Sequence, residues 1–599
     1  MQGLILAAGM GKRLGKHTQD QTKGMVKVNG ITLIERAINT LVRHNITRIV
    51  IVVGYKGDKL RRFIKSKYPN LDIVFTNNPI YDTTNNIYSL WLAKKYLIQE
   101  DTILLESDVI FEDKILKGLM ESPHKNLAVV AKYESWMDGT VTLVDGDDNI
   151  TNFISKKNFD WDKVKHYYKT VNIYKFSKEF CERYYVPFLD AYIKTMGNNE
   201  YYEQVLKVIT YLDRLNLKAY QLDDEKWYEI DDVQDLDIAE TLFAEKEEEL
   251  VLYQRRFGGY WRYPKLKDFC YLVNPYFPNE RMLNELKSNF STLITQYPSG
   301  LEIQNLLAAK MFGCEASEIL VGNGASEFIN SIFGILPGKV GVVYPTFNEY
   351  PERARNRVVE FIPKNMDFEY TVAELKELSD EVEVIVLINP DNPSGHFLMK
   401  KDVVDLLDYL KKENKYLILD ESFIDFAEEN VRFSMIDSEI LQQYPNLIII
   451  KSISKSYGVP GVRLGVLACG NPQLISEIRK KSPIWNINSF GEYFLQIIGK
   501  YKNEYYKACN SICEERTRFY QELKKIKFLR VLPSMSNYFL CEVTQGFTAT
   551  DLSKILLNNH QIFIKDCTGK KGFEGKNYVR IAVRDSADNT FLTEKLKKM

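Results

Sequence analysis

The sequence lacks an excess of charge of either sign, because 79 basic and 80 acidic side chains leave a formal net charge of −1. Such a chain has no basic field that would attract nucleic acid or an anionic membrane. It also lacks any apolar run long enough to cross a bilayer. Its first residues enter a predicted strand without the basic and apolar segments of a secretion signal. We therefore expect a cytoplasmic protein that binds neither nucleic acid nor membrane.

Cysteine pairs with the spacing of metal sites are missing as well. The eight cysteines are scattered, and none forms a CxxC pair. Cys509 and Cys513 lie four residues apart and could share a helix face, but no cluster of His or Cys accompanies them. Structural thiols in a reducing compartment are therefore expected, rather than zinc sites or disulfides.

The chain is long enough for more than one domain. At 599 residues it exceeds what a single hydrophobic core supports. In the first half, short apolar runs such as Leu4–Leu6 alternate with segments of helical periodicity such as residues 33–42, which predicts an α/β fold with parallel strands. A segment rich in Gly, Pro and aromatics follows near residue 258. We predict a first domain at 1–245, a linker at 246–268 and a second domain at 269–599.

The stretch LILAAGMGKRL, residues 4–14, combines a strand with a turn of small residues and a basic pair. Small residues allow backbone N–H groups to approach a ligand, and glycine accepts positive φ. Lys12 and Arg13 add fixed positive charge. The residues alone fit either a nucleoside triphosphate site or an ordinary turn with solvated basic side chains.

The spacing excludes a GxxxxGK[ST] phosphate loop. It resembles the (L)AAGxGxRL signature of sugar-phosphate and choline-phosphate nucleotidyltransferases, which is followed by PKxLxxVxG. Here the second motif reads TKGMVKVNG, with Thr22 in place of the usual proline. The resemblance implies a GT-A/Rossmann-like nucleotidyltransferase domain in which Lys23 and Arg13 act on the triphosphate. The nucleotide-binding residues that it implies are Leu6, Ala7, Ala8, Gly9, Gly11, Lys12, Arg13, Lys23, Asn85, Asn86 and Ser89.

The segment NNIYSL, which begins at Asn85, bears on the base. Its amide and hydroxyl side chains could read a base edge or a ribose, or could cap the helix that follows. The pattern is typical of the choline-phosphate cytidylyltransferases, so the resemblance favours CTP.

Two acidic segments far apart in the sequence suit a magnesium ion. Asp108 ends a predicted strand, and Asp231 lies in WYEIDDVQDLDIAE. Mg²⁺ prefers few carboxylates together with phosphate and water. By resemblance, Asp108 and Asp231 are the metal ligands, whereas Asp232 and Asp235 cap a helix. Catalysis then consists of positioning and charge neutralisation, without a side-chain nucleophile.

The segments between these acidic residues contain a candidate acceptor site. Trp136 and Tyr202 could surround an ammonium group through cation–π contacts, and Asp138 or Glu203 could supply charge. The aromatic residues could equally belong to the core. The predicted acceptor is a small zwitterion that carries a phosphate or phosphonate.

The second half centres on IIIKSISKSYGVPGVRLGVLACG, residues 448–470. A lysine flanked by small hydroxyl residues and followed by an arginine fits a Schiff-base lysine beside a phosphate site. Four further motifs precede this stretch in the order GNGASE, YPTFNEY, NPDNPSG and YLILDESFIDF, and a fifth, NYVRIAV, follows it.

Together these motifs resemble the fold-type I enzymes that use pyridoxal 5'-phosphate, with histidinol-phosphate aminotransferase and threonine-phosphate decarboxylase as the most similar branch. The resemblance implies that Lys455 binds the cofactor covalently, that Asp420 pairs with the pyridine nitrogen and that Arg580 binds an α-carboxylate. It also implies a homodimer through this half. The remaining implied cofactor residues are Ala325, Ser326, Phe347, Asn392, Ser452, Ser454 and Arg463, with Asn274 on the substrate side.

One position departs from the aminotransferase pattern. Phe423 stands where this branch commonly has a tyrosine, and decarboxylase relatives also carry phenylalanine there. Transamination and decarboxylation therefore both stay open.

The order of the two halves resembles the fused phosphonate cytidylyltransferase/2-aminoethylphosphonate transaminases. That resemblance implies formation of 2-aminoethylphosphonate from phosphonoacetaldehyde with an amino-acid donor, and then its CTP-dependent conversion to CMP-2-aminoethylphosphonate. The acceptor could instead be phosphocholine or another amino-alcohol phosphate. The second half could also be a phospho-amino-acid decarboxylase, or one half could serve only as a regulatory or scaffold module.

Overall fold

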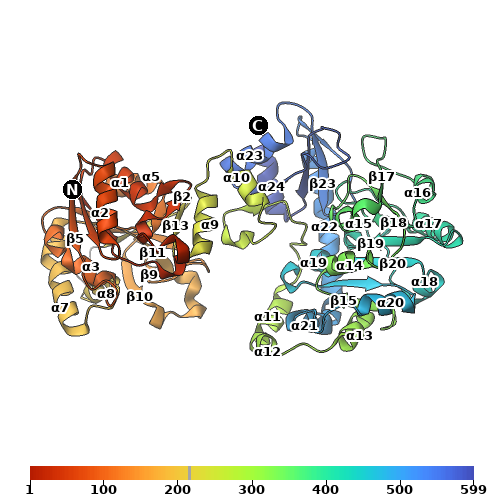
Figure 1. The fold of residues 1–599 in the computed structure, drawn as a ribbon, viewed down its shortest axis with the longest axis horizontal. Helices are drawn as coiled ribbons and strands as arrows, with labels where there is room; N and C mark the ends of the chain where they lie inside the picture. The colour runs from red at the N-terminus through yellow and green to blue at the C-terminus, as the bar shows by residue number, and fades with distance from the viewer. Residues whose placement is uncertain (213–216) are drawn as a thin grey trace. The chain divides into compact units, whose positions relative to one another are not determined.

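The computed structural model describes residues 1–212 and 217–599, which form two compact units at Met1–Arg262 and Tyr263–Met599 (Figure 1). Within the described residues, none of the helices combines the length and apolar character needed to span a bilayer.

The first unit is built on a nine-stranded sheet in which β1 lies between β4 and β6 and is parallel to both. Strand β11 is antiparallel to β6 and extends the sheet towards β8 and β9. The strands of this unit, including two small pairs outside the large sheet, are β1 (Gln2–Ala7), β2 (Lys27–Val28), β3 (Ile31–Thr32), β4 (Arg48–Val53), β5 (Asp72–Asn77), β6 (Thr102–Glu106), β7 (Val109–Phe111), β8 (Leu127–Lys132), β9 (Val141–Val144), β10 (Ile150–Ile154), β11 (Tyr168–Phe176), β12 (Lys218–Leu222) and β13 (Trp227–Glu229).

Both faces of this sheet are covered, so β1 is apolar throughout. Ile5 points into the core under α1, α2 and α5, whereas Leu4 and Leu6 point into the core under α3, α7 and α8. A capping box of Thr32 and Glu35 begins α1. The helices of this unit are α1 (Leu33–Arg43), α2 (Gly57–Lys67), α3 (Asn86–Leu92), α4 (Lys94–Leu97), α5 (Asp113–Glu121), α6 (Lys178–Phe180), α7 (Val186–Met196), α8 (Glu203–Thr210), α9 (Val233–Leu242) and α10 (Glu249–Gln254).

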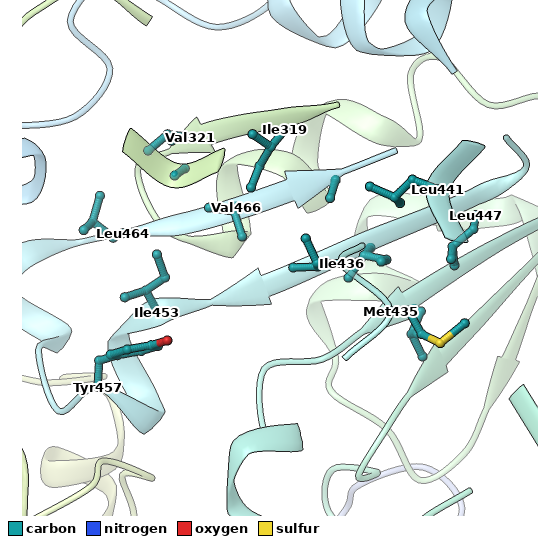
Figure 2. Close-up of a cluster of buried hydrophobic side chains, with 14 of the residues drawn as sticks. Ile319, Val321, Met435, Ile436, Leu441, Leu447, Ile453, Tyr457, Leu464 and Val466 are labelled. Carbon is teal, nitrogen blue, oxygen red and sulfur yellow. The ribbon is translucent and has the colours of Figure 1, made fainter. Parts of the chain in front are cut away.

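The second unit contains a seven-stranded sheet in the order β15-β21-β20-β19-β18-β16-β17, and only β21 runs antiparallel to its neighbours. Side chains of β20 alternate between two cores, with Ile449 in one and Ile448 and Ile450 in the other. Figure 2 shows the first of these cores, where Ile319 and Val466 lie on neighbouring strands. The strands are β15 (Ile319–Gly322), β16 (Val340–Val343), β17 (Val358–Phe361), β18 (Val384–Ile388), β19 (Tyr416–Asp420), β20 (Leu447–Ser452) and β21 (Gly465–Ala468).

A smaller lobe of the second unit carries an antiparallel sheet in the order β22-β23-β26-β25. Its strands, with the separate pair β14 and β24, are β14 (Lys267–Asp268), β22 (Leu529–Val531), β23 (Tyr538–Val543), β24 (Ile562–Phe563), β25 (Lys565–Asp566) and β26 (Tyr578–Ala582). The helices of the second unit are α11 (Glu280–Ser288), α12 (Phe290–Thr295), α13 (Leu301–Phe312), α14 (Ala325–Ile332), α15 (Glu349–Ala354), α16 (Val372–Ser379), α17 (Lys400–Lys412), α18 (Ser438–Gln443), α19 (Ile453–Ser456), α20 (Pro472–Arg479), α21 (Ser489–Ile497), α22 (Lys502–Leu523), α23 (Ala549–His560) and α24 (Ser586–Leu596).

Two candidate active sites

In the first unit, a cavity of about 240 Å³ opens at the carboxyl ends of β1 and β6. This is the edge of a parallel sheet where ligands bind in α/β folds. The predicted residues that line it are Leu6, Ala8, Gly9, Arg13, Lys23, Asn85, Asn86, Ser89, Asp108, Asp138, Glu203 and Asp231. The structure places five further predicted residues outside this lining, namely Ala7, Gly11, Lys12, Trp136 and Tyr202.

Gly11 supports the cavity wall instead of lining it. Its φ of 62° lies in the left-handed region, and a Cβ there would stand 3.2 Å from the Cβ of Lys23. Glycine is therefore needed for the turn and for its close approach to the segment that carries Lys23.

A cluster of opposite charges forms the centre of the cavity. The Lys23 ammonium donates to Asp108 at 2.5 Å and to Asp231 at 2.7 Å. Arg13 pairs with the second oxygen of Asp231 at 2.9 Å. Burial disfavours the charged form of Lys23, but the two carboxylates outweigh it and raise the pKa of Lys23 above its usual range. Burial likewise opposes ionisation of Asp231, yet Lys23 and Arg13 lower its pKa.

A third carboxylate that the sequence analysis did not select, Glu229, joins this centre. One oxygen each of Asp108, Glu229 and Asp231 lies within 4.8 Å of the others. Oδ1 of Asp108 is buried and has no hydrogen-bond partner among the described residues. These hard oxygen donors fit Mg²⁺. The signal was available in the sequence, because residues two apart on an extended segment, as Glu229 and Asp231 are, face the same side.

The aromatic residues of the predicted ammonium site take part in packing contacts, and its acidic residue Asp138 has a cationic partner. Trp136 stacks on Tyr228, with ring centroids 4.1 Å apart, and Tyr202 is fully buried. Asp138 is paired with Lys156 at 2.9 Å. The aromatic residues thus belong largely to the packing of the unit.

Buried carboxyl groups line the same cavity, where a nearby cation would favour their charged form. Glu203 is 3% exposed, and its Oε2 has no hydrogen-bond partner among the described residues. Burial raises the pKa of Glu203 to about 7. Glu106 also lines the cavity and accepts a hydrogen bond from Asn86 at 3.0 Å. One such cation is Lys169, which pairs with Glu229 at 3.2 Å.

In the second unit, β19 and β20 bring two predicted residues together. Asp420 ends β19 and Lys455 follows β20 in α19. Burial lowers the pKa of Lys455 to about 8, because the opposing effect of Asp420 is too weak to cancel it and Arg580 adds to the lowering. The Lys455 ammonium lies 3.8 Å from the ring centroid of Phe423 and 5.7 Å from that of Phe347.

Asp420 is held by two donors. The buried hydroxyl of Tyr350 donates to its Oδ2 at 2.8 Å, and the backbone N–H of Ser422 donates to its Oδ1 at 2.9 Å. Tyr350 was not selected from the sequence, although it ends the quoted motif YPTFNEY. These bonds fix the orientation of the carboxylate.

A tight cradle of backbone and cationic groups lies at the start of α14. A Cβ on Gly324 would stand 2.7 Å from Nη2 of Arg463, and one on Gly465 would stand 2.3 Å from the backbone nitrogen of Ala325. The hydroxyl of Ser454 is buried without a hydrogen-bond partner among the described residues. A helix start, a guanidinium and an unsatisfied hydroxyl are suitable phosphate ligands.

The substrate-side residues have separate roles. Arg580 donates to Asn392 Oδ1 at 2.8 Å and to the Cys270 carbonyl oxygen at 2.9 Å. The side chain of Asn274 donates to the backbone oxygen of Ser456 at 3.0 Å, so it fixes the loop beside the candidate lysine. The arrangement as a whole fits pyridoxal phosphate, with a reactive amine, a carboxylate for the ring nitrogen and a phosphate cradle.

Both units are similar to known protein families. Residues 279–596, more than half of the chain, match the family model described as aminotransferase class I and II. Residues 3–153 match the model of the MobA-like NTP transferase domain.

Among similar proteins, CMP-5'-(3-aminopropyl)phosphonate synthase of Streptomyces rubellomurinus is 29% identical over 98% of this chain and 93% of its own length. L-serine phosphate decarboxylase of Campylobacter jejuni is 32% identical over 55% of this chain and 87% of its own length. The solved structure of a decarboxylase from Sulfurospirillum multivorans, 30% identical, covers 57% of this chain and 90% of its own with a TM-score of 0.52. The histidinol-phosphate aminotransferase of Clostridium acetobutylicum, 27% identical, gives a TM-score of 0.50 over 56% of this chain and 98% of its own.

The predicted fold class is confirmed for both halves.

Proposed function

Since the chain belongs to the aminotransferase class I and II family and carries a nucleotidyltransferase domain ahead of that region, we propose that its two domains act in succession on one aminoalkylphosphonate. The chain is an enzyme with both kinds of domain. In the proposed sequence, the second domain transfers an amino group from an amino acid to phosphonoacetaldehyde. The first domain then joins the resulting 2-aminoethylphosphonate to CMP from CTP and releases pyrophosphate. The 29% identical CMP-5'-(3-aminopropyl)phosphonate synthase supports a CMP-aminoalkylphosphonate as the product.

In the first domain, the residues act by charge and position. Lys23 and Arg13 stay cationic beside Asp108 and Asp231, so they can bind the triphosphate and stabilise charge on the departing pyrophosphate. Asp108, Glu229 and Asp231 would hold Mg²⁺, which supplies charge neutralisation when bound. The phosphonate oxygen of the acceptor is itself the nucleophile, so no side chain needs to form a covalent bond.

In the second domain, pyridoxal phosphate supplies an electron sink when bound. Lys455 would hold it and, as an amine whose pKa is about 8, can accept and return a proton at the substrate carbon. Asp420, fixed by Tyr350, would keep the ring nitrogen protonated. Arg463 and Ser454 would bind the phosphate.

One observation carries the choice of an acceptor with an amine. Glu203 is buried, has an unpartnered carboxylate oxygen among the described residues and lines the same cavity as Lys23 and Arg13. Its other oxygen accepts a hydrogen bond from Tyr174 at 3.2 Å. A buried carboxylate oxygen that stays without a partner is costly, and an ammonium group would satisfy it. The cavity therefore joins a site for phosphorus anions to a site for a cation.

The test is pyrophosphate release by the purified full-length enzyme with CTP and Mg²⁺. We expect release with 2-aminoethylphosphonate, less with phosphocholine, whose trimethylammonium cannot donate hydrogen bonds, and least with ethylphosphonate, which lacks the amine. 3-Aminopropylphosphonate tests the chain length. Release with none of the amine-bearing acceptors would overturn the proposal, and preference for phosphocholine would replace its substrate.

A second candidate function for the second domain is decarboxylation of a phospho-amino acid. The ring of Phe423 lies against Lys455, where aminotransferases of the similar branch commonly place a tyrosine hydroxyl. A protein named L-serine phosphate decarboxylase is 32% identical to this region. The reaction would yield an amino-alcohol phosphate, which the first domain could join to CMP. Release of CO₂ from phosphoserine, without keto-acid formation, would select this function.

The quaternary structure and the domain limits belong to the same proposal. We place the domains at 1–245 and 269–599 and expect a homodimer through the second. Large apolar side chains of this unit are exposed, among them Phe290 at 54%, Ile294 at 61%, Tyr297 at 78% and Ile484 at 75%. Analytical ultracentrifugation of the full chain and of residues 269–599 tests this, because both should sediment as dimers.

A further inference from the structure

Strand β11 contains a residue with a left-handed backbone beside the cavity of the first unit. Asn172 has a φ of 61°, a conformation that is unfavourable for residues other than glycine. The pairing of β11 with β8 shifts around it, since Thr170 lies opposite Val130 whereas Tyr174 lies opposite Ala128. Strand β11 therefore holds extra residues there, as in a β-bulge, and bulges redirect side chains next to active sites.

The irregularity brings two side chains of β11 to the same carboxylate. In a regular strand, residues spaced like Lys169 and Asn172 point to opposite faces of the sheet. Here both line the cavity that also contains Lys23. The Asn172 amide nitrogen donates to Glu229 Oε1 at 3.2 Å, and the Lys169 ammonium lies 3.2 Å from Glu229 Oε2. Each oxygen of Glu229 thus has its own partner on β11.

Both partners of Glu229 are themselves held in place. Lys169 and Asn172 are buried, and the Lys169 ammonium also donates to the Thr170 carbonyl oxygen at 2.6 Å. The Thr170 hydroxyl can donate to Asn172 Oδ1 at 3.3 Å, so the amide nitrogen faces Glu229. A carboxylate oxygen can accept more than one contact. Glu229 can therefore bind a cation together with Asp108 and Asp231 while it keeps these two partners.

We propose that Asn172 is a positioning residue of the first domain, whose amide orients Glu229 toward Asp108 and Asp231 so that the three carboxylates bind the divalent cation of the nucleoside triphosphate. The inference rests on the proposed nucleotidyl transfer and deepens it. Side chains that orient metal ligands in this way typically change metal affinity about ten- to a hundredfold. The left-handed backbone of Asn172 is then a consequence of directing its amide at Glu229.

The test measures binding by the full-length enzyme and needs no turnover. The ligand is α,β-methylene-CTP, whose α-phosphorus cannot release pyrophosphate. Electron paramagnetic resonance of Mn²⁺ follows binding of its Mn²⁺ complex, and calorimetry in EDTA follows binding of the metal-free form. Asn172→Gly removes the amide but suits the left-handed φ. We expect it to weaken binding of the Mn²⁺ complex about tenfold and that of the metal-free form less than about twofold.

Two further variants accompany Asn172→Gly. Asn45→Gly is the matched control, because Asn45 also has a φ of 61° but lies exposed after α1. It should change neither affinity. Thr170→Val keeps Asn172 and removes only the hydroxyl that orients its amide, so it should weaken binding of the Mn²⁺ complex about threefold. This variant tests the same contact if Asn172→Gly does not fold.

An equal loss of both affinities in Asn172→Gly, or no loss of either, would overturn the positioning role. So would an unsubstituted enzyme that binds the Mn²⁺ complex no better than the metal-free form. A higher KM for the acceptor with unchanged binding of the Mn²⁺ complex would also overturn it and would assign Asn172 to the acceptor site. Since the titrations contain no acceptor, failure of every amine-bearing acceptor to release pyrophosphate would overturn the proposed function alone.

Discussion

Lys23 in the first unit and Lys455 in the second are both buried lysines, and their pKa values move in opposite directions. Two carboxylates contact Lys23 at 2.5 and 2.7 Å and raise its pKa. Lys455 has one more distant carboxylate, Asp420, and an opposing Arg580, so burial prevails and the pKa falls to about 8. The difference teaches that burial alone does not define a lysine's chemistry. The paired lysine is a permanent charge suited to phosphate, and the unpaired one is an amine that can react.

The largest effect that separates the two sites is expected from Lys455→Ala. Removing the amine should lower transamination at least about a thousandfold, because cofactor attachment and proton transfer are both lost. Pyrophosphate release should stay within about twofold. Absorbance of bound cofactor, keto-acid formation and pyrophosphate release measure the three quantities. Cofactor that stays covalently attached to the variant after borohydride reduction and denaturation would show that another residue holds it.

Asp108→Asn tests the paired lysine. It removes the negative charge that pairs with Lys23 and replaces a carboxylate ligand for Mg²⁺ by a neutral amide, so pyrophosphate release should fall about a hundredfold or more without loss of transamination. Asp113→Asn is the control, since this carboxylate is half-exposed and pairs with Arg43 on the same unit. Equal rates in the two variants would contradict the assignment.

Tyr350→Phe tests how the second site fixes its single carboxylate. The variant loses the hydroxyl that donates to Asp420, which should lower transamination about tenfold. It should also shift the pH dependence of cofactor absorbance, which a purely structural role would leave unchanged. Tyr409→Phe is the matched control, because its hydroxyl bonds Asp380 at the surface.

The smallest effect is a shift in a pH profile. Only the neutral amine of Lys455 reacts with pyridoxal phosphate, so capture of the cofactor by cofactor-free enzyme should increase with pH and level off above about 8. Arg580→Gln removes a positive charge that lowers this pKa, so the midpoint should move to higher pH. Lys571→Gln should leave it in place, since Lys571 is paired with Glu360. A downward shift in Arg580→Gln would contradict the electrostatic explanation.

Residues within continuous motifs could be selected from the sequence. The glycine turn, Lys455 and Arg463 each lie close to an apolar strand, so their positions near the strand ends follow from the order of elements. Glu229 and Tyr350 were not selected: Glu229 could have been found from its spacing to Asp231, whereas the role of Tyr350 depends on a partner far away in the chain. Glu229 can bind a metal ion together with Asp108, and the hydroxyl of Tyr350 donates a hydrogen bond to Asp420.

The aromatic residues show most directly which roles the sequence alone could not distinguish. For Trp136 the sequence left a role as ammonium ligand and a role in the core equally open, and the structure stacks it on Tyr228, which comes from a distant segment of the sequence. Composition cannot separate a core aromatic from a ligand-binding one, since both are apolar and buried. In the same way, the approach of Lys169 and Asn172 to Glu229 depends on strand register, which the sequence does not display.

By itself, the sequence determined the α/β class, the presence of two kinds of enzyme domain and the strand ends that carry the main charged residues. Apolar runs and glycine turns encode these features locally, since a strand buried on both faces must be apolar and a tight turn needs glycine. Only the tertiary structure decided which charges pair, which stay unpaired and therefore how each lysine titrates. Those properties depend on distances of a few ångströms between distant segments, where electrostatic energies change steeply.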